Sequence, residues 1–366
     1  MESPQNVVAV FLSDLHLSVR AWKSRPIEGD SAFALKQACD LCRKHNAPLV
    51  LAGDVFDTRQ FGSWPLHVFL RHTADLPRVY FIQGQHEMQD PPWCGVASNA
   101  EHIHGKTVQL GGGINMYGID FQLRGDLAEQ IDKIPPSTDV VLAHQVWDPW
   151  MPEFASPQGS LKDVPHCSLM VSGDLHQYKS DQITRDDGSV YTALSLGAAS
   201  MRTVAEPSHH FVGLMDSSGS VTPWTLDSRP VVDREYNTTT SLEEAYRDLE
   251  QAVASATASA PEEVKKPILR IKVDRQLNIE SELKDRFGES SHLFIRMARE
   301  SDNNEPSAFE GVVRHASASG METALAMTEA YFQEQGEDNL VPMAKDLIQD
   351  PDTHKMLSSH HQKVKS

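Results

Sequence analysis

The sequence predicts an α/β protein built around a mostly parallel β-sheet. Short apolar runs without charge, such as Val7–Leu12 and Pro48–Ala52, are typical of strands buried on both faces. A helix-like segment, Ser31–His45, lies between these two runs, and strand, helix, strand is the pattern of a βαβ unit. Five such runs are each followed at once by histidine or carboxylate residues. The same runs therefore indicate both the fold class and the place of a site.

The remaining elements of the first 228 residues continue this alternation. They are expected as helices over Pro65–Leu76 and Gly125–Ile134 and as strands over Arg78–Ile82, Ile114–Phe121, Asp139–Ala143, Ser168–Ser172, Val190–Leu196, Phe211–Leu214 and Val221–Leu226. One large domain over residues 1–228 is predicted, because the composition changes near Ser228-Arg229-Pro230.

A second, small domain is predicted over residues 229–300. Its helix is expected over Ser241–Ala258, which has a helical apolar stripe, and its strand over Ile268–Val273. Residues 301–320 are polar and are expected to form a linker. Residues 321–366 are expected to form a helical tail that docks on a partner, and a helix packed back on its own domain is the alternative.

Composition limits the classes of protein to which the chain can belong. No apolar run is long enough to cross a bilayer and the N-terminus has no signal-peptide pattern, so we expect a cytoplasmic protein without a membrane partner. The four cysteines are too few for a disulfide framework, and Cys39 and Cys42 are expected to pack on one helix face. The net charge of −18 repels polyanions, so a DNA partner would require local basic patches, bound metals or a second protein.

The polar residues after the strands predict a metal centre. Asp14 and His16 are expected to share a face because side chains alternate along a strand, and the carboxyl ends of parallel strands meet at one edge of a sheet. Each motif alone is also a good turn, but five turns would seldom all carry ligating residues. The predicted ligands are Asp14, His16 and His176 for one ion, Gln85, His144 and Asp174 for the other, and Asp54 as the bridge.

This donor set predicts two-metal hydrolysis of a phosphoester. Oxygen and imidazole ligands without thiolate favour Mn²⁺, with Mg²⁺, Fe²⁺ and Zn²⁺ as alternatives. His86 is the candidate proton donor to the leaving group, and Glu87 is expected to orient it. Asp57 is either a hydrogen-bond acceptor behind a ligand histidine or a turn residue.

Several side chains are candidates for contact with DNA. Basic side chains would bind phosphates and an aromatic ring would stack on a base, although each is equally compatible with a solvated loop or with the solvent face of an edge strand. These candidates are Arg20, Trp22, Lys23, Arg25, Arg59, Arg270 and Lys272.

The five motifs resemble those of a known family. The series DLH, GDVFD, GQHE, LAHQ and GDLH resembles the phosphoesterase motifs of the calcineurin-like metallophosphoesterases. Within that family, the order of elements, the LAHQ form and the segment PILRIKVD resemble the SbcD-type DNA-repair nucleases. The resemblance implies a four-layer αββα sandwich with a small α+β capping domain, a di-manganese site and DNA exonuclease and endonuclease activity. It also implies a homodimer and an SbcC-type ATPase partner that binds the C-terminal helices.

Two motifs depart from the family pattern. Gln85 and Glu87 stand where the family has Asn and Asp, and Asp174 stands where the family has His. Ligating atoms remain at these positions, so we expect an active enzyme. A stand-alone phosphoesterase acting on small molecules or phosphoproteins is one alternative. A DNA-end-binding scaffold with a weak catalytic site is the other.

Overall fold

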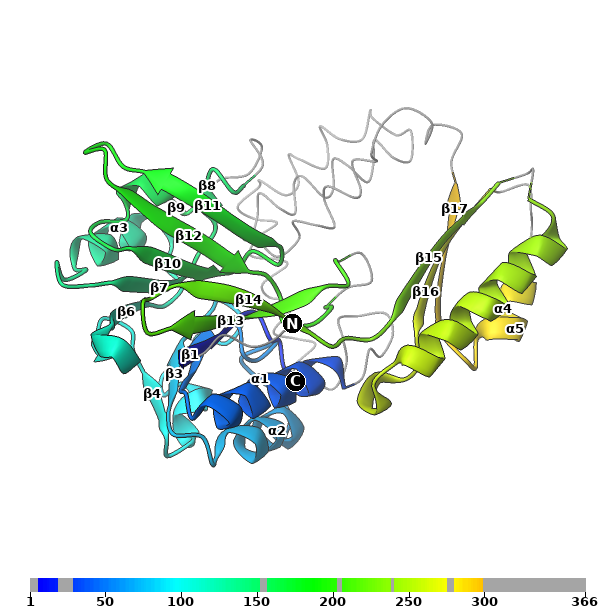
Figure 1. Cartoon of the computed structure of the whole chain (residues 1–366), viewed down its shortest axis with the longest axis horizontal. Helices are drawn as coiled ribbons and strands as arrows, with labels where there is room; N and C mark the ends of the chain where they lie inside the picture. Colours follow the sequence, from blue (N-terminus) through cyan, green and yellow to red (C-terminus); the bar gives the residue numbers. More distant parts are fainter. Residues whose placement is uncertain are drawn as a thin grey trace, which may run out of the picture. The chain divides into compact units, whose positions relative to one another are not determined.

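Two six-stranded sheets face each other in the part of the chain that precedes β15 (Val231–Tyr236) (Figure 1). The computed structural model describes residues 6–18, 29–151, 157–202, 206–237, 240–274 and 280–298. The first sheet has the order β14 (Val221–Leu226), β13 (His210–Asp216), β1 (Val7–Leu12), β2 (Leu49–Ala52), β3 (Val79–Ile82) and β4 (Ala100–His102). The second has the order β11 (Tyr178–Thr184), β12 (Val190–Leu196), β10 (Leu169–Gly173), β7 (Val140–His144), β6 (Asn115–Ile119) and β5 (Thr107–Gln109).

The centre of each sheet is parallel. β1 pairs with β2 and β2 with β3 in parallel, as do β6 with β7, β7 with β10 and β10 with β12. The antiparallel strands lie at the margins: β13 and β14 in the first sheet, and β5 and β11 in the second. The carboxyl ends of β1, β2 and β3 therefore point the same way, as do those of β7 and β10.

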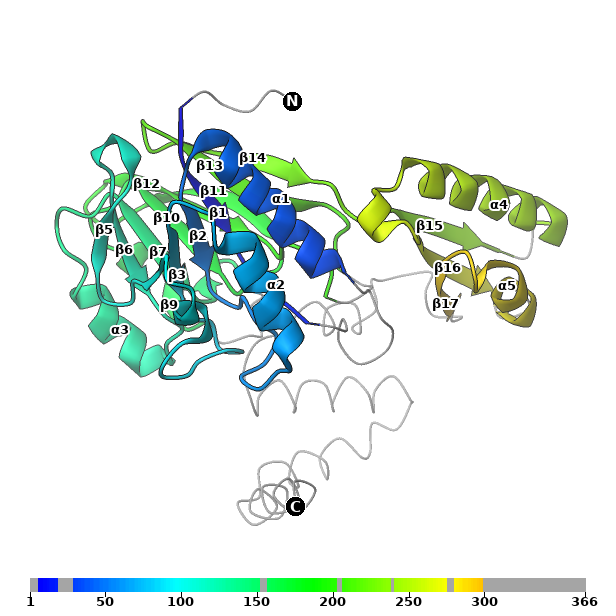
Figure 2. The same cartoon turned by 90° about the horizontal axis from the view of Figure 1, so that it is seen from below.

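The sheets and helices form four layers. α1 (Asp30–His45) and α2 (Ser63–Thr73) cover the outer face of the first sheet, and α3 (Arg124–Asp132) covers the outer face of the second (Figure 2). Phe11 of β1 contributes to the core between the sheets, whereas Leu12 packs under the helices. The strand is apolar throughout because both of its faces are buried. The predicted α/β sandwich is confirmed.

A separate three-stranded sheet follows the sandwich. It contains β15 (Val231–Tyr236), β16 (Ile268–Asp274) and β17 (His292–Ala298), with α4 (Leu242–Ser259) and α5 (Glu280–Phe287) packed against one face. The side chain of Ser241 accepts a hydrogen bond from the N–H of Glu244 in a capping box that starts α4. The predicted boundary after residue 228 falls between β14 and β15.

Some elements had no sequence signal. β4 and β5 are only three residues long, and β11 exposes most of its polar side chains because it is an edge strand. β15, β17 and α5 were also not predicted, and neither were the two-residue strands β8 (Trp147–Asp148) and β9 (Gly159–Ser160). In the described residues no helix is both long and apolar enough to cross a membrane. The predicted linker and helical tail, residues 301–366, lie outside the described residues.

Candidate metal centre

The predicted ligands follow strand ends on strained backbone. Asp14, His16, Asp54 and Asp174 all have positive φ, at 47°, 47°, 49° and 77°. Such left-handed conformations cost about 1 kcal/mol or more in residues other than glycine and concentrate at functional sites. Asp14 and His16 lie beyond the end of β1 and not within it. Two left-handed residues, and not strand alternation as expected, therefore direct both side chains into the site.

Glycines let the loops that carry these ligands approach one another. A Cβ on Gly84 would lie 2.1 Å from Oδ1 of Asp54, and one on Gly173 would lie 2.3 Å from the carbonyl oxygen of Ala52. Gly53 has a φ of +87°, and its Cβ would lie 2.3 Å from Nδ1 of His144. The glycines that precede the ligands in three of the motifs are thus steric requirements of the site.

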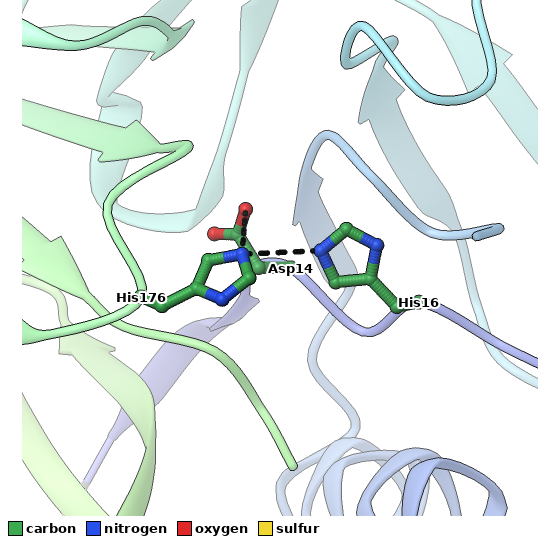
Figure 3. A group of neighbouring side chains, drawn as sticks. All are labelled: Asp14, His16 and His176. Atoms are coloured by element: carbon green, nitrogen blue, oxygen red, sulfur yellow. Dashed lines mark hydrogen bonds and ion pairs between the residues drawn. The ribbon is translucent and has the colours of Figure 1, made fainter. Parts of the chain in front are cut away.

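The first group of ligands is Asp14, His16 and His176 (Figure 3). The Nε2 atoms of His16 and His176 face each other at 3.2 Å, and Nε2 of His176 lies 3.8 Å from Oδ1 of Asp14. The Asp14 carboxylate also accepts hydrogen bonds from the N–H of Asp174 and the hydroxyl of Ser13. These bonds fix its orientation toward the two imidazoles.

Asp54 lies at the centre of the cluster. Its side chain is 1% exposed, and its Oδ1 accepts a hydrogen bond from the N–H of His86 at 3.0 Å. Among the described residues its Oδ2 has no hydrogen-bond partner, and it faces Nε2 of His144 at 3.4 Å, of His16 at 3.8 Å and of His86 at 3.9 Å. One carboxylate oxygen thus faces three imidazole nitrogens, from the end of β7 and from the segments that follow β1 and β3.

The charges of the cluster compensate one another. Burial opposes ionisation of Asp54, but His144 and His86 outweigh it and hold the pKa of this carboxyl below its usual range. Burial likewise opposes protonation of His144, yet Asp54, Asp14 and Asp174 raise the pKa of that imidazole well above its ordinary value. Protons therefore balance the carboxylates here, and a divalent cation would displace them.

Gln85 and Asp174 contact each other. Nε2 of Gln85 donates to Oδ1 of Asp174 at 2.5 Å, while Oε1 of Gln85 and Oδ2 of Asp174 are buried and have no hydrogen-bond partner among the residues that the structure describes. Burial raises the pKa of Asp174 to about 6. The His144 ring donates through Nδ1 to the carbonyl oxygen of Ala52 at 2.7 Å, which fixes its orientation, and its Nε2 has no hydrogen-bond partner within the described part of the chain. These buried atoms without partners are the donor set that a hard divalent cation requires, so the residues fit a metal.

The surroundings of His86 differ from expectation. Its Nδ1 lies 3.1 Å from the carbonyl oxygen of Asp57, which orients the ring. Glu87, which was expected to orient it, is buried and accepts the N–H of Phe56 at 2.8 Å. The carboxylate of Asp57 lies 3.5 Å from Nδ1 of His16, behind a predicted ligand.

Two residues of the site had no sequence signal. Glu206 accepts from Nδ1 of His176 at 2.9 Å. Burial opposes protonation of His176, but the hydrogen bond and charge of Glu206, together with the charge of Asp14, raise its pKa to about 9. The side chain of Arg202 is 10% exposed and lies 3.0 Å from Asp57 and 3.3 Å from Nε2 of His86. Both residues are in the loop after β12. The predicted ligands were found because they directly follow buried strands, and these two residues lie farther from the strand end.

The predicted DNA-binding residues remain predictions. Arg59 is exposed two residues after Asp57. Arg270 pairs with Asp233 at 2.6 Å, and Lys272 pairs with Glu235 at 3.1 Å. The other predicted DNA-binding residues lie outside the described residues; they are Arg20, Trp22, Lys23 and Arg25.

Comparisons with known proteins show similarity at the level of structure alone. No family model and no curated protein matches the chain. The structure of TT1561 of Thermus thermophilus is similar at 11% identity, over 61% of this chain and 100% of that one, with a TM-score of 0.40. Purple acid phosphatase PPD1 from yellow lupin (Lupinus luteus) seeds is similar at 13% identity, over 60% of this chain and 53% of that one, with a TM-score of 0.32. Both scores are low, so the function has to follow from the side chains and not from these similarities.

Replacing Gly84 with alanine is expected to destroy the site. The new methyl group would collide with Asp54. The free energy of unfolding, measured by urea denaturation, should therefore be at least about 2 kcal/mol lower in Gly84→Ala than in the wild type. Gly95→Ala is the matched control, because its Cβ would meet nothing closer than a Pro92 side-chain atom at 3.7 Å. Equal stability of the two variants would contradict the packing described here.

Glu87→Gln is expected to stabilise the chelator-treated protein at alkaline pH. Burial raises the pKa of Glu87 from 4.5 to about 8, so the unfolded chain ionises while the folded one keeps its proton. The free energy of unfolding of the wild type should therefore fall as pH rises from about 4.5 to about 8. That of Glu87→Gln should fall less, so that at pH 8 the variant is favoured by more than about 1 kcal/mol. Urea denaturation at pH 5 and pH 8 measures this, and Glu289→Gln, at an exposed glutamate, is the control. A difference that does not change with pH would contradict the assignment.

Proposed function

We propose that this protein is a metal-dependent phosphoesterase. The observation that carries the proposal is Oδ2 of Asp54, which is buried, has no hydrogen-bond partner in the described residues and faces three imidazole nitrogens within 3.9 Å. A carboxylate shared between two groups of nitrogen and oxygen donors is the arrangement that bridges a pair of divalent ions. Asp14, His16 and His176 would hold one ion, and Gln85, His144 and Asp174 the other.

Bound divalent ions at such a centre activate water and offset the charge that develops on a phosphoryl group. The chain itself supplies the proton for the leaving group. The carbonyl oxygen of Asp57 accepts from Nδ1 of His86, which leaves Nε2 directed toward the centre of the site. That nitrogen also lies 3.3 Å from the Arg202 guanidinium, a cation that disfavours a metal ion there. Burial, and after it the charge of Arg202, lower the pKa of His86, so its imidazolium would be a strong acid toward the leaving oxygen.

We further propose that the substrate is DNA and that the chain is the nuclease subunit of an SbcCD-type complex, with Mn²⁺ as the favoured metal. The five motifs and the small α+β unit after residue 228 support this assignment. A helical tail that binds an ATPase would reconcile the net charge of −18 with a polyanionic substrate, because the ATPase would provide part of the DNA-binding surface. A homodimer belongs to the same proposal.

Asp54→Asn and His86→Ala are expected to fail in different ways. Asp54→Asn removes the bridging charge and should lose both Mn²⁺ binding, measured by calorimetry, and hydrolysis of bis(p-nitrophenyl) phosphate. His86→Ala should bind Mn²⁺ like the wild type but lower kcat by about 10²- to 10⁴-fold, because only the proton donor is removed.

His67→Ala serves as the control for these variants, since His67 is exposed on α2. Wild-type protein that binds no Mn²⁺ would refute the metal centre. Normal kcat in His86→Ala would refute its role as the proton donor while leaving the metal centre intact.

The Mn²⁺-loaded full chain is expected to shorten or nick a linear DNA duplex. Gel electrophoresis of an end-labelled duplex measures the cleavage, which should fall with added salt because phosphate contacts weaken, and His86→Ala should abolish it. Hydrolysis of bis(p-nitrophenyl) phosphate with intact DNA, even with the ATPase added, would instead support a phosphoesterase of small molecules or phosphoproteins.

A further inference from the structure

We propose that Arg202 binds a non-bridging oxygen of the substrate phosphoryl group, beside the proton donor His86. The inference rests on the proposed phosphoesterase function and adds a substrate-binding residue to it. Arg202 is in the loop between β12 and β13, outside all five motifs, and its side chain is only 10% exposed. A guanidinium buried this deeply beside a cluster that binds cations needs anions around it: Asp57 supplies one at 3.0 Å, and a substrate phosphoryl group would supply a second.

The position of the guanidinium relative to His86 indicates that the anion it would bind is the substrate phosphoryl group. A proton donor must lie next to the leaving oxygen of the phosphoester, and the non-bridging oxygens are bonded to the same phosphorus atom. A nitrogen of Arg202 lies 3.3 Å from Nε2 of His86, the atom that would transfer the proton. A phosphoryl group within reach of His86 is therefore also within reach of Arg202, whose planar fork of donors matches phosphate oxygens.

The local structure holds Arg202 in place before any substrate binds. Its backbone N–H donates to Oε2 of Glu206 at 2.5 Å, and the other oxygen of the same carboxylate accepts from His176 at 2.9 Å. Its side chain pairs with Asp57 at 3.0 Å. One carboxylate thus fixes both the backbone of Arg202 and a predicted metal ligand. Donors that are positioned in advance stabilise developing charge most effectively.

Arg202→Gln and Arg202→Lys test the inference in the full chain loaded with Mn²⁺. Inorganic phosphate is the probe, and its binding is measured by calorimetry and by inhibition of bis(p-nitrophenyl) phosphate hydrolysis. Arg202→Gln is expected to raise the Kd for phosphate and the KM by at least about 10-fold, because a charge-assisted hydrogen bond is lost. Arg202→Lys should recover part of the loss, since it keeps the charge without the fork. The Kd for Mn²⁺ should change less than about 3-fold, because Arg202 is not a ligand.

Arg185→Gln is the matched control: Arg185 is also partly buried but donates to the carbonyl oxygens of Val164 and Cys167. Unchanged phosphate affinity in Arg202→Gln would overturn the inference. So would equal losses of Mn²⁺ and phosphate binding, which would indicate a structural role alone. If circular dichroism shows that Arg202→Gln does not fold, Arg202→Lys is measured in its place. A wild-type Kd for phosphate in Arg202→Lys would contradict recognition of phosphate by the planar guanidinium donors. Wild-type protein that binds phosphate through Arg202 yet hydrolyses no ester would refute the proposed function but not this inference.

Discussion

The structure depends on keeping the Asp54 carboxylate buried and ionised among imidazoles. A carboxylate removed from water requires compensating partners, and within the described residues Asp54 accepts one conventional hydrogen bond, from the N–H of His86. The remaining compensation comes from the Nε2 atoms of three histidines, at the end of β7 and after β1 and β3, which all face Oδ2. Left-handed backbone at four of the site residues and the absence of a Cβ at Gly53, Gly84 and Gly173 are the local costs of that convergence. The packing of the two large sheets offsets this local strain and holds the ligand-bearing segments in place.

Much of this arrangement could be predicted because buried strands leave a direct record in the sequence. Val7–Leu12 and Leu49–Ala52 are apolar on both faces, and polar residues begin where each strand ends. Arg202 and Glu206 could not be found in this way, because they lie several residues beyond the end of β12 and their roles arise from tertiary contacts with His86 and His176. β11 could not be found either, since an edge strand with exposed polar residues has no distinguishing pattern.

The two motifs that depart from those of the resembled family meet at one contact. Asp174 stands where the resembled motif has a histidine, and burial raises the pKa of this carboxyl to about 6. Gln85 stands where that motif has an asparagine, is one methylene longer and donates to the Asp174 carboxylate from 89 residues away in the chain. The amide therefore satisfies one oxygen of Asp174, while its own oxygen and the second carboxylate oxygen have no partner among the described residues. The pair thus keeps two hard oxygen donors, which would favour harder cations.

Arg270 illustrates how a sequence pattern and a tertiary contact can point in different directions. Arg270 and Lys272 alternate along β16, which made them candidates for a DNA-facing surface, but the parallel register sets them opposite Asp233 and Glu235 on β15. The resulting ion pairs reduce the free positive charge on that face, so a DNA contact there would have to compete with them. Arg270 also donates to the carbonyl oxygen of Glu206 at 3.2 Å, and Glu206 in turn accepts from His176. Arg270 and Glu206 thus link the three-stranded sheet to His176, a predicted metal ligand, through two consecutive hydrogen bonds.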